Sequence, residues 1–187
     1  MRTNLDLHDA FYGGRTEVFK QLTQGVIKYI DVVSLYPTVQ YYDEYPVGHY
    51  EVKTDFKPEY FGFVYCAILP PNDLYLPVLP YHVKAINSHK LVFGLCRTCM
   101  ETLDNKCDHF KYKINNFKQE QIRKIKEMSC LKCAQYRGKH CSHNENERMI
   151  IGFWPTVEIN KAIEKGYRII NVYQTWHFPL RSNSLFK

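Results

Sequence analysis

The sequence predicts an α+β fold, in which a mostly antiparallel or mixed sheet carries helices on one face. Short runs of β-branched and aromatic residues recur along the chain, and 15% of its residues are aromatic. Two stretches have the apolar spacing of amphipathic helices, and the second ends at a glycine that precedes another strand pattern. Helices that follow a series of strands, rather than alternating with them, favour this class. With 187 residues the chain is long enough to form one domain with a real core.

The chain is organised around KYIDVVSLYP, residues 28–37. We predict a buried strand from Val26 to Val33, with Asp31 near its end, and a short helical turn that begins at Ser34. A carboxylate at the end of an apolar strand costs free energy unless it is paired or binds a cation. Asp31 is therefore a candidate metal ligand, and Tyr36 is a candidate neighbour of whatever the metal holds. A helix N-cap is the alternative role for Asp31, although Ser34 can fill that role alone.

A pair of glycines precedes this stretch in FYGGR, residues 11–15. Gly13 and Gly14 permit a tight turn and a close approach of the backbone to a ligand. Arg15 follows them directly and could direct its planar guanidinium at a phosphate. A plain hairpin turn is the alternative.

The remaining strands are predicted from β-branched and aromatic content, and prolines mark the extended or edge segments. Residues 41–51 read as a loop. The predicted strands are 60–69, short edge strands within 74–83, 90–94 and 167–178. Cys66 lies in the first of these strands and is expected to be a buried core residue.

Two helices are predicted from apolar spacing and terminal signals. The first covers residues 114–128. The second begins after Pro155, with Thr156 as N-cap, and ends at Gly166. Its buried stripe consists of Ile159, Ala162 and Ile163.

Six of the seven cysteines form two copies of one pattern. Each copy offers three thiolates and one imidazole, which is a complete tetrahedral ligand set for a structural Zn²⁺ ion. We therefore predict one or two zinc sites, formed within each copy or by mixing ligands between copies. The copies are Cys96-x2-Cys99-x7-Cys107-x-His109 and Cys130-x2-Cys133-x7-Cys141-x-His143.

The positive charge of the chain is concentrated in the same region. The net charge is +6, and residues 84–143 contain 13 Lys and Arg against 5 Asp and Glu, whereas the rest contains 12 and 14. Such an excess attracts nucleic acids, although a solvated basic face is the alternative. Cysteines at metal-ligand spacing favour a reducing, intracellular compartment. No apolar run is long enough to span a membrane, and the N-terminus lacks the apolar core of a secretory signal.

Several motifs occur together in one order. DVVSLYP at 31–37 resembles the signature D-x-x-S-L-Y-P of family B DNA polymerases, and FYGGR at 11–15 precedes it at a suitable distance. YPVGHY at 45–50, LCRTC at 95–99, CSHNENER at 141–148 and GFWPTVEINKAIEKGYRIINVYQTWHF at 152–178 follow. Together they resemble the protein-primed, organellar and viral type of this family, most closely the version carried by Maverick/Polinton-like elements and related viruses.

This resemblance implies a polymerase palm domain that joins deoxynucleotides by phosphoryl transfer with two Mg²⁺ ions. The implied partners are template–primer DNA, a deoxynucleoside triphosphate and a terminal priming protein, with no membrane. The nucleus or a viral factory would suit such a protein. Gly13, Gly14 and Arg15 would contact the template strand.

The resemblance also implies roles for the residues of the signature. Asp31 would bind both Mg²⁺ ions, and the Val32 carbonyl would add a ligand. The backbone N–H groups of Ser34, Leu35 and Tyr36 would face the triphosphate at the start of a helix. The side chain of Tyr36 would lie under the sugar and exclude a 2′-hydroxyl.

Two further motifs of the family, K-x3-N-S-x-Y-G and D-T-D-S, do not occur in the sequence. One aspartate cannot hold two Mg²⁺ ions in a productive geometry, so we expect a fragment that is inactive alone. Residues 1–95 would form the N-terminal part of the palm, 96–143 an inserted zinc-stapled basic segment, and 144–187 a palm helix and strand before the fingers. The alternative is a non-catalytic, zinc-containing nucleic-acid-binding or interaction protein derived from such a polymerase.

Overall fold

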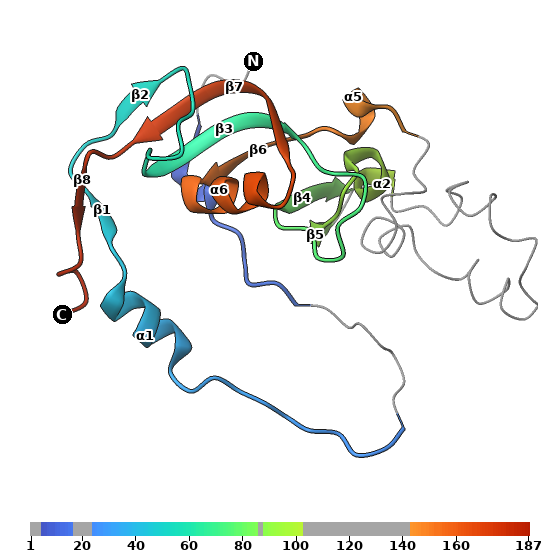
Figure 1. Ribbon diagram of the computed structural model, residues 1–187, viewed down its shortest axis with the longest axis horizontal. Coiled ribbons are helices and arrows are strands. Elements are labelled where there is room, and N and C mark those ends of the chain that lie inside the picture. Colours follow the sequence, from blue (N-terminus) through green and yellow to red (C-terminus); the bar gives the residue numbers. More distant parts are fainter. Residues whose placement is uncertain (1–4, 17–23, 86–87, 103–142) are drawn as a thin grey trace, which may run out of the picture.

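The computed structural model describes residues 5–16, 24–85, 88–102 and 143–187. Its centre is a four-stranded sheet in the order β2-β7-β3-β6, in which every neighbouring pair of strands is antiparallel (Figure 1). The strands are β2 (Glu51–Lys53), β3 (Gly62–Leu69), β6 (Ile150–Pro155) and β7 (Arg168–His177). The predicted α+β class with a mostly antiparallel sheet is confirmed, and β3 and β7 match the strands predicted at 60–69 and 167–178.

Strand β3 lies between β7 and β6, and its side chains alternate between two apolar clusters. Val64, Cys66 and Ile68 belong to the principal core, whereas Phe63 and Tyr65 contact a second cluster that contains Phe153 and Trp176. Successive side chains of a strand point to opposite faces, so a central strand with both faces covered reads as a continuous apolar run. Cys66 is buried as predicted, and burial raises the pKa of its thiol to about 12.

Helix α6 (Thr156–Glu164) packs on the face of the sheet that carries the principal core (Figure 1). Ile159 and Ala162 are buried there as predicted, but Ile163 is 40% exposed. The prediction of Thr156 as N-cap is wrong, because Pro155 occupies that position. The Thr156 hydroxyl instead accepts a hydrogen bond of 3.1 Å from the Gly62 N–H, which joins the helix to the start of β3.

A hairpin and a short helix close the other side of the principal core. β4 (Pro80–Ala85) pairs with β5 (Ser88–Phe93), which confirms the strand predicted at 90–94, and α2 (Arg97–Thr102) follows. Leu79, Val83, Val92, Leu95 and Met100 contribute to the core from this side. The indole N–H of Trp154 donates to the Pro80 carbonyl at 3.0 Å, which ties β6 to the hairpin.

Five smaller elements complete the described fold. The 3₁₀ turn η1 (Leu7–Ala10) packs against β6, and α5 (Glu145–Arg148) precedes β6. Helix α1 (Leu35–Tyr42) is followed by β1 (Tyr45–Val47), which pairs with β8 (Leu180–Ser182) in a separate two-stranded ladder. The loop predicted at 41–51 is therefore wrong in part, because β1 and the beginning of β2 lie within it.

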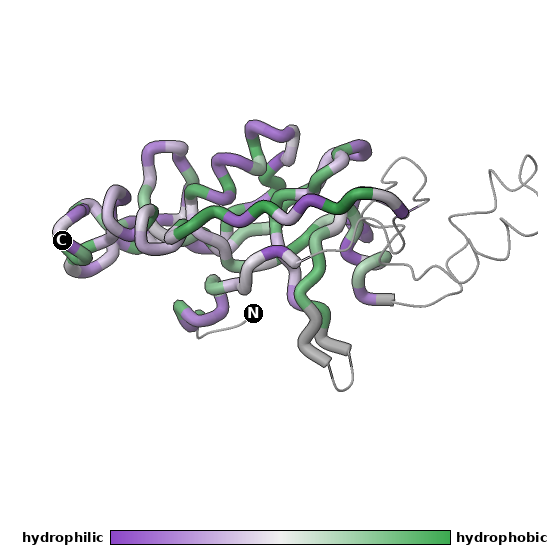
Figure 2. The backbone as a smooth tube through the Cα atoms, turned by 90° about the horizontal axis from the view of Figure 1, so that it is seen from below, coloured by the Kyte–Doolittle hydropathy of each residue, from purple (hydrophilic) through white to green (hydrophobic). Residues whose placement is uncertain are grey.

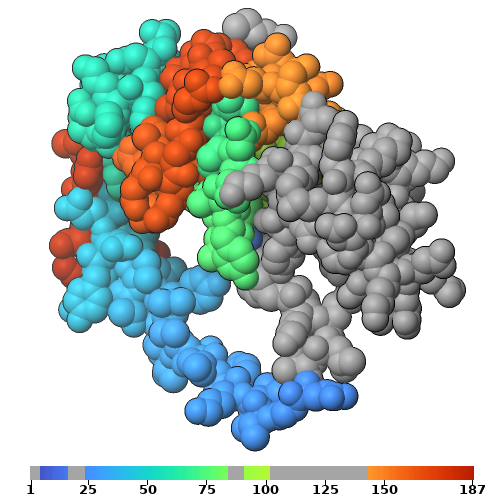
Figure 3. All heavy atoms as spheres, turned by 45° about the vertical axis from the view of Figure 1, so that its right-hand side comes forward, coloured from blue at the N-terminus to red at the C-terminus, as the bar shows by residue number. Residues whose placement is uncertain are grey.

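The buried strand predicted from Val26 to Val33 is also wrong. The segment is extended but pairs with no strand among the described residues, and Val26, Ile30 and Val33 are 93%, 85% and 83% exposed. Hydrophobic stretches run along it (Figure 2), and it stands apart from the sheet as an outlying strip (Figure 3). Apolar composition favours a strand, but burial requires a neighbouring strand and a covering face, and no described segment supplies them. We call residues 24–34 the extended arm.

The helix predicted at 114–128 lies outside the described residues. Among the helices that the structure describes, none is long and apolar enough to cross a membrane.

Candidate functional site

The extended arm ends at Ser34, where the chain turns sharply into α1. Ser34 occupies the N-cap position as predicted, but it has φ 56° and ψ 33°, and its side chain makes no capping hydrogen bond. Side-chain capping normally requires extended backbone at this position, which explains the missing bond. The N–H groups of the first helical turn have no acceptors within a helix, so those of Leu35 and Tyr36 point away from the body of α1. Asp31 is exposed on the arm three residues before this turn.

The glycine pair and Tyr36 lie close together although 22 positions separate Gly14 from Tyr36. A Cβ atom added to Gly14 would lie 3.7 Å from the Tyr36 hydroxyl. Arg15 holds this segment against the hairpin: its guanidinium donates to the Pro77 carbonyl at 2.7 Å and lies 4.7 Å from the centre of the Phe93 ring. The structure therefore brings together two motifs that the sequence places apart.

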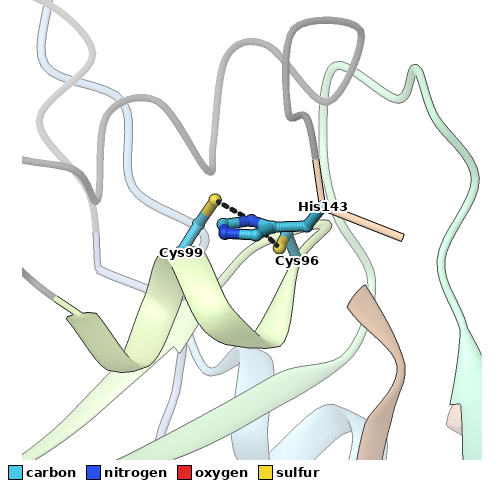
Figure 4. A group of neighbouring side chains, drawn as sticks. All are labelled: Cys96, Cys99 and His143. Carbon is cyan, nitrogen blue, oxygen red and sulfur yellow. Dashed lines mark hydrogen bonds between the residues drawn. The ribbon is translucent and has the colours of Figure 1, made fainter. Parts of the chain in front are cut away.

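Cys96 and Cys99 lie at the start of α2, and His143 lies directly before the N-cap of α5 (Figure 4). The Nδ1 atom of His143 is 3.2 Å from the Cys96 sulfur and 3.4 Å from the Cys99 sulfur. One ligand atom from each of the three residues lies within 4.8 Å of the others. Both cysteines are buried and His143 is half-buried, so the arrangement can hold a metal ion with two sulfurs and one nitrogen.

Two hydrogen bonds hold α2 against α5 beside this group. The Thr98 hydroxyl donates to the Glu147 carbonyl at 2.9 Å, and the Arg97 guanidinium donates to the Asn146 carbonyl at 3.4 Å. Helix α5 begins with a capping box, in which Asn144 and Glu147 each accept from the other's backbone N–H. The capping box thus fixes the backbone next to His143, and the two hydrogen bonds from α2 hold the same helix in place.

Residues 4–97, half of the chain, match the family described as DNA polymerase type B, organellar and viral. The chain belongs to this family. No curated protein and no solved structure matches it in the other comparisons.

The matched region of this type B DNA polymerase chain contains the glycine pair, the extended arm and the start of α1. It also contains Cys96, whereas Cys99 and His143 lie beyond it. In the described part of the chain, Cys96, Cys99 and His143 are the one group of at least three residues that could hold a metal ion. Asp31 therefore has no pair of further metal ligands beside it there.

Five other predicted zinc ligands lie outside the described residues. They are Cys107, His109, Cys130, Cys133 and Cys141.

A cavity of about 850 Å³ beside the glycine pair was not predicted from the sequence. Tyr12 stacks on His82 there with 4.9 Å between the ring centres, and the Tyr81 hydroxyl donates to a Glu101 carboxylate oxygen at 2.5 Å. Burial raises the pKa of Tyr12 and of Tyr81, so both hydroxyls stay protonated as donors. The lining comes from η1, β3, β4, α2 and β6 together, so no local motif marks it. The high tyrosine content is the one related signal in the sequence.

Proposed function

We propose that this chain is part of the catalytic domain of a DNA polymerase that extends DNA by deoxynucleotidyl transfer, in protein-primed replication of a mobile element or virus. The observation that carries the proposal is the family match over residues 4–97, which contains both the glycine pair and D-x-x-S-L-Y-P. The implied partners are template–primer DNA and a deoxynucleoside triphosphate. A terminal priming protein is proposed as a further partner from the resemblance of the motifs alone.

In this proposal Asp31 is the first carboxylate of the catalytic site. Carboxylate and carbonyl oxygens are the ligands that Mg²⁺ prefers, and the exposed Asp31 with the Val32 carbonyl fits part of such a set. Two Mg²⁺ ions, when bound, promote attack by the primer 3′-hydroxyl and stabilise the leaving pyrophosphate. The sequence has no D-T-D-S motif to supply the partner carboxylate, so we expect the 187 residues alone not to extend a primer.

The start of α1 would bind the incoming nucleotide. The N–H groups of Ser34, Leu35 and Tyr36, for which the helix itself supplies no acceptors, would donate to the triphosphate, and the positive end of the helix dipole favours its charge. The Tyr36 ring would lie against the sugar. The closeness of Gly14 to the Tyr36 hydroxyl supports this arrangement, because a template strand on Gly13, Gly14 and Arg15 would then pass beside the nucleotide.

Replacement of Asp31 tests the proposal in a polypeptide that joins these residues to the two missing motifs. Asp31→Ala should lower primer extension by about 10³-fold or more, since a metal-binding carboxylate acts on the transition state. The melting temperature should not change, because the side chain is exposed.

The matched control is Asp43→Ala, an exposed carboxylate at the other end of α1. Extension should remain close to that of the unaltered protein. Full extension by Asp31→Ala would contradict the proposal.

A second candidate is a non-catalytic, zinc-containing nucleic-acid-binding protein derived from such a polymerase. The Cys96, Cys99 and His143 group favours it, because a metal-stapled basic segment can bind nucleic acid without catalysis. DNA binding without extension in the polypeptide with all motifs would favour this candidate.

A further inference from the structure

The three side chains at the start of α2 and before α5 have the spacing of a tetrahedral zinc site. Zn–S bonds of about 2.3 Å and a Zn–N bond of about 2.0 Å at tetrahedral angles place sulfur and nitrogen about 3.5 Å apart. The observed distances from His143 Nδ1 are 3.2 Å to the Cys96 sulfur and 3.4 Å to the Cys99 sulfur. Figure 4 shows the imidazole directed at both sulfurs at once.

The three residues come from different copies of the cysteine pattern. Cys96 and Cys99 open the first copy, whereas His143 closes the second. We infer that Cys96, Cys99 and His143 bind one structural Zn²⁺ ion, so that the first Cys-x2-Cys pair works with the last histidine of the second copy. This inference does not rest on the proposed polymerase activity.

Burial favours a structural ion over a nucleophilic or redox thiol. Cys96 and Cys99 are only 2% and 1% exposed, whereas reactive cysteines are partly accessible to their substrates. A structural site has four protein ligands. The described residues supply three of them, which are Cys96, Cys99 and His143.

The ion would act as a clamp at the base of the inserted segment. It would join the first residues of the segment 96–143 to its last residue, at the place where Thr98 and Arg97 already donate to the carbonyls of α5. Ligand pairing within each copy would instead leave the two ends without a shared ion. The two pairings therefore differ in which histidine protects Cys96 and Cys99.

Alkylation of the thiols followed by peptide mass spectrometry distinguishes the pairings in the full 187-residue chain loaded with Zn²⁺. His143→Ala should raise the alkylation rate of Cys96 and Cys99 by about tenfold or more, because bound thiolates react slowly. His109→Ala, the closing histidine of the first copy, is the matched control and should leave both cysteines protected. Cys66 reports on the fold, because it is fully buried in β3 and should stay unreactive in both variants.

Three results would overturn the inference. Loss of protection of Cys96 and Cys99 in His109→Ala but not in His143→Ala would establish pairing within the first copy. Loss of protection in both variants, with Cys66 still protected, would indicate one shared cluster. Unchanged alkylation after a strong chelator removes all metal would show that no ion protects these thiols.

Reaction of Cys66 in His143→Ala would show that this variant has unfolded, and a second variant then tests the inference. His143→Cys keeps a metal ligand at the position and should remain folded with Zn²⁺. After metal removal and mild oxidation, the introduced thiol should form a disulfide with Cys96 or Cys99. A disulfide with Cys130 or Cys133 instead would overturn the inference.

Discussion

Gly62 allows β3 to begin against β7 without a side chain between them. Its φ is +141°, a conformation that residues with a side chain rarely adopt, and an added Cβ would lie 2.1 Å from the Trp176 carbonyl oxygen. Its N–H also donates to the Thr156 hydroxyl, so the same residue connects the sheet to α6. A side chain at position 62 would push β3 away from β7 and disturb the contact with α6.

Gly62→Ala should therefore lower the free energy of unfolding by about 2–4 kcal/mol, from backbone strain and overpacking. Urea unfolding followed by tryptophan fluorescence measures the change. Gly13→Ala is the control, because its Cβ would make an ordinary contact of 3.9 Å with Leu91. Equal losses for the two variants would refute this explanation.

Glu158 gives the stability of the protein a pH dependence. Burial raises the pKa of its carboxyl, and its Oε2 atom is buried without a hydrogen-bond partner in the described residues. The folded state favours the protonated carboxyl, so its pKa is higher in the folded than in the unfolded chain. The free energy of unfolding therefore falls as pH rises from the pKa of the unfolded chain to that of the folded chain. Glu158→Gln should therefore be more stable than the unaltered chain at neutral pH, and the difference should disappear below about pH 4.

Glu164→Gln is the control of opposite sign. A hydrogen bond from Lys161 lowers the pKa of Glu164, so its small contribution is present at neutral pH and is lost as pH falls through the folded pKa. Thermal melts across pH measure both variants. A Glu158→Gln protein that is less stable at neutral pH would contradict the assignment.

Tyr36 should decide the choice of sugar in the polymerase that we propose. Tyr36→Val removes the ring that would exclude a 2′-hydroxyl, so ribonucleotide incorporation relative to deoxynucleotide incorporation should rise by about 10²-fold or more. Single-nucleotide extension in the polypeptide with all motifs measures the ratio. Tyr42 lies on the same helix and is 73% exposed, so Tyr42→Val should leave this ratio unchanged.

At the scale of elements, Arg148 at the end of α5 joins this helix to the loop after β3. The buried guanidinium donates to the carbonyls of Pro70 and Pro71 at 2.9 and 2.8 Å and also to the Asn72 side chain. A methionine of similar length would leave these oxygens without donors.

Arg148→Met should therefore lower the free energy of unfolding by about 2–4 kcal/mol. Arg168→Met is the control, since Arg168 is exposed and pairs with Glu145 at the surface, where such pairs contribute about 1 kcal/mol at most. Denaturant unfolding compares them. Similar losses of unfolding free energy in both variants would mean that the buried contacts of Arg148 contribute no more than a surface ion pair.

The apolar pattern of the sequence correctly predicted the elements whose apolar side chains are covered by another element. Strands β3 and β7 and helix α6 were predicted because an apolar run or stripe meets a partner that covers it. The extended arm has a similar apolar composition to β3 but no partner in the described residues, and a pattern cannot specify its partner. Thr156 was assigned as a cap for the same reason, since its contact with Gly62 comes from 94 positions away.

At the scale of the whole molecule, the sequence revealed the ligand types of the candidate sites but not how they assemble. The spacing of the cysteines predicted metal binding, yet left open which copy contributes which ligand. The closeness of Gly14 to Tyr36 and the cavity beside Tyr12 depend on how the chain folds back on itself. No pattern within one element contains that information.

The charge distribution predicts salt-sensitive DNA binding by the whole chain. Residues 84–143 carry most of the positive charge, and release of counterions from DNA makes such binding weaken steeply with salt. Reversing Lys124 and Lys126 to Glu should lower affinity about tenfold at low salt and make the salt dependence shallower. Fluorescence anisotropy with a labelled duplex measures both, and Lys161→Glu on α6 is the control. Binding that does not change with salt would contradict this prediction.

The contact between α2 and α5 has a consequence for how this chain can change in evolution. The two helices meet through the Thr98 and Arg97 hydrogen bonds, whose partners all lie outside positions 103–142. Residues added between positions 102 and 143 would then lengthen a connection whose two ends are already together, which costs little free energy because the entropy of closing a connection grows slowly with its length. A 34-residue offset separates the two copies of the cysteine pattern. The fold could therefore accept a longer or a shorter segment between α2 and α5 at a small cost in free energy, and we expect related chains to differ in length here.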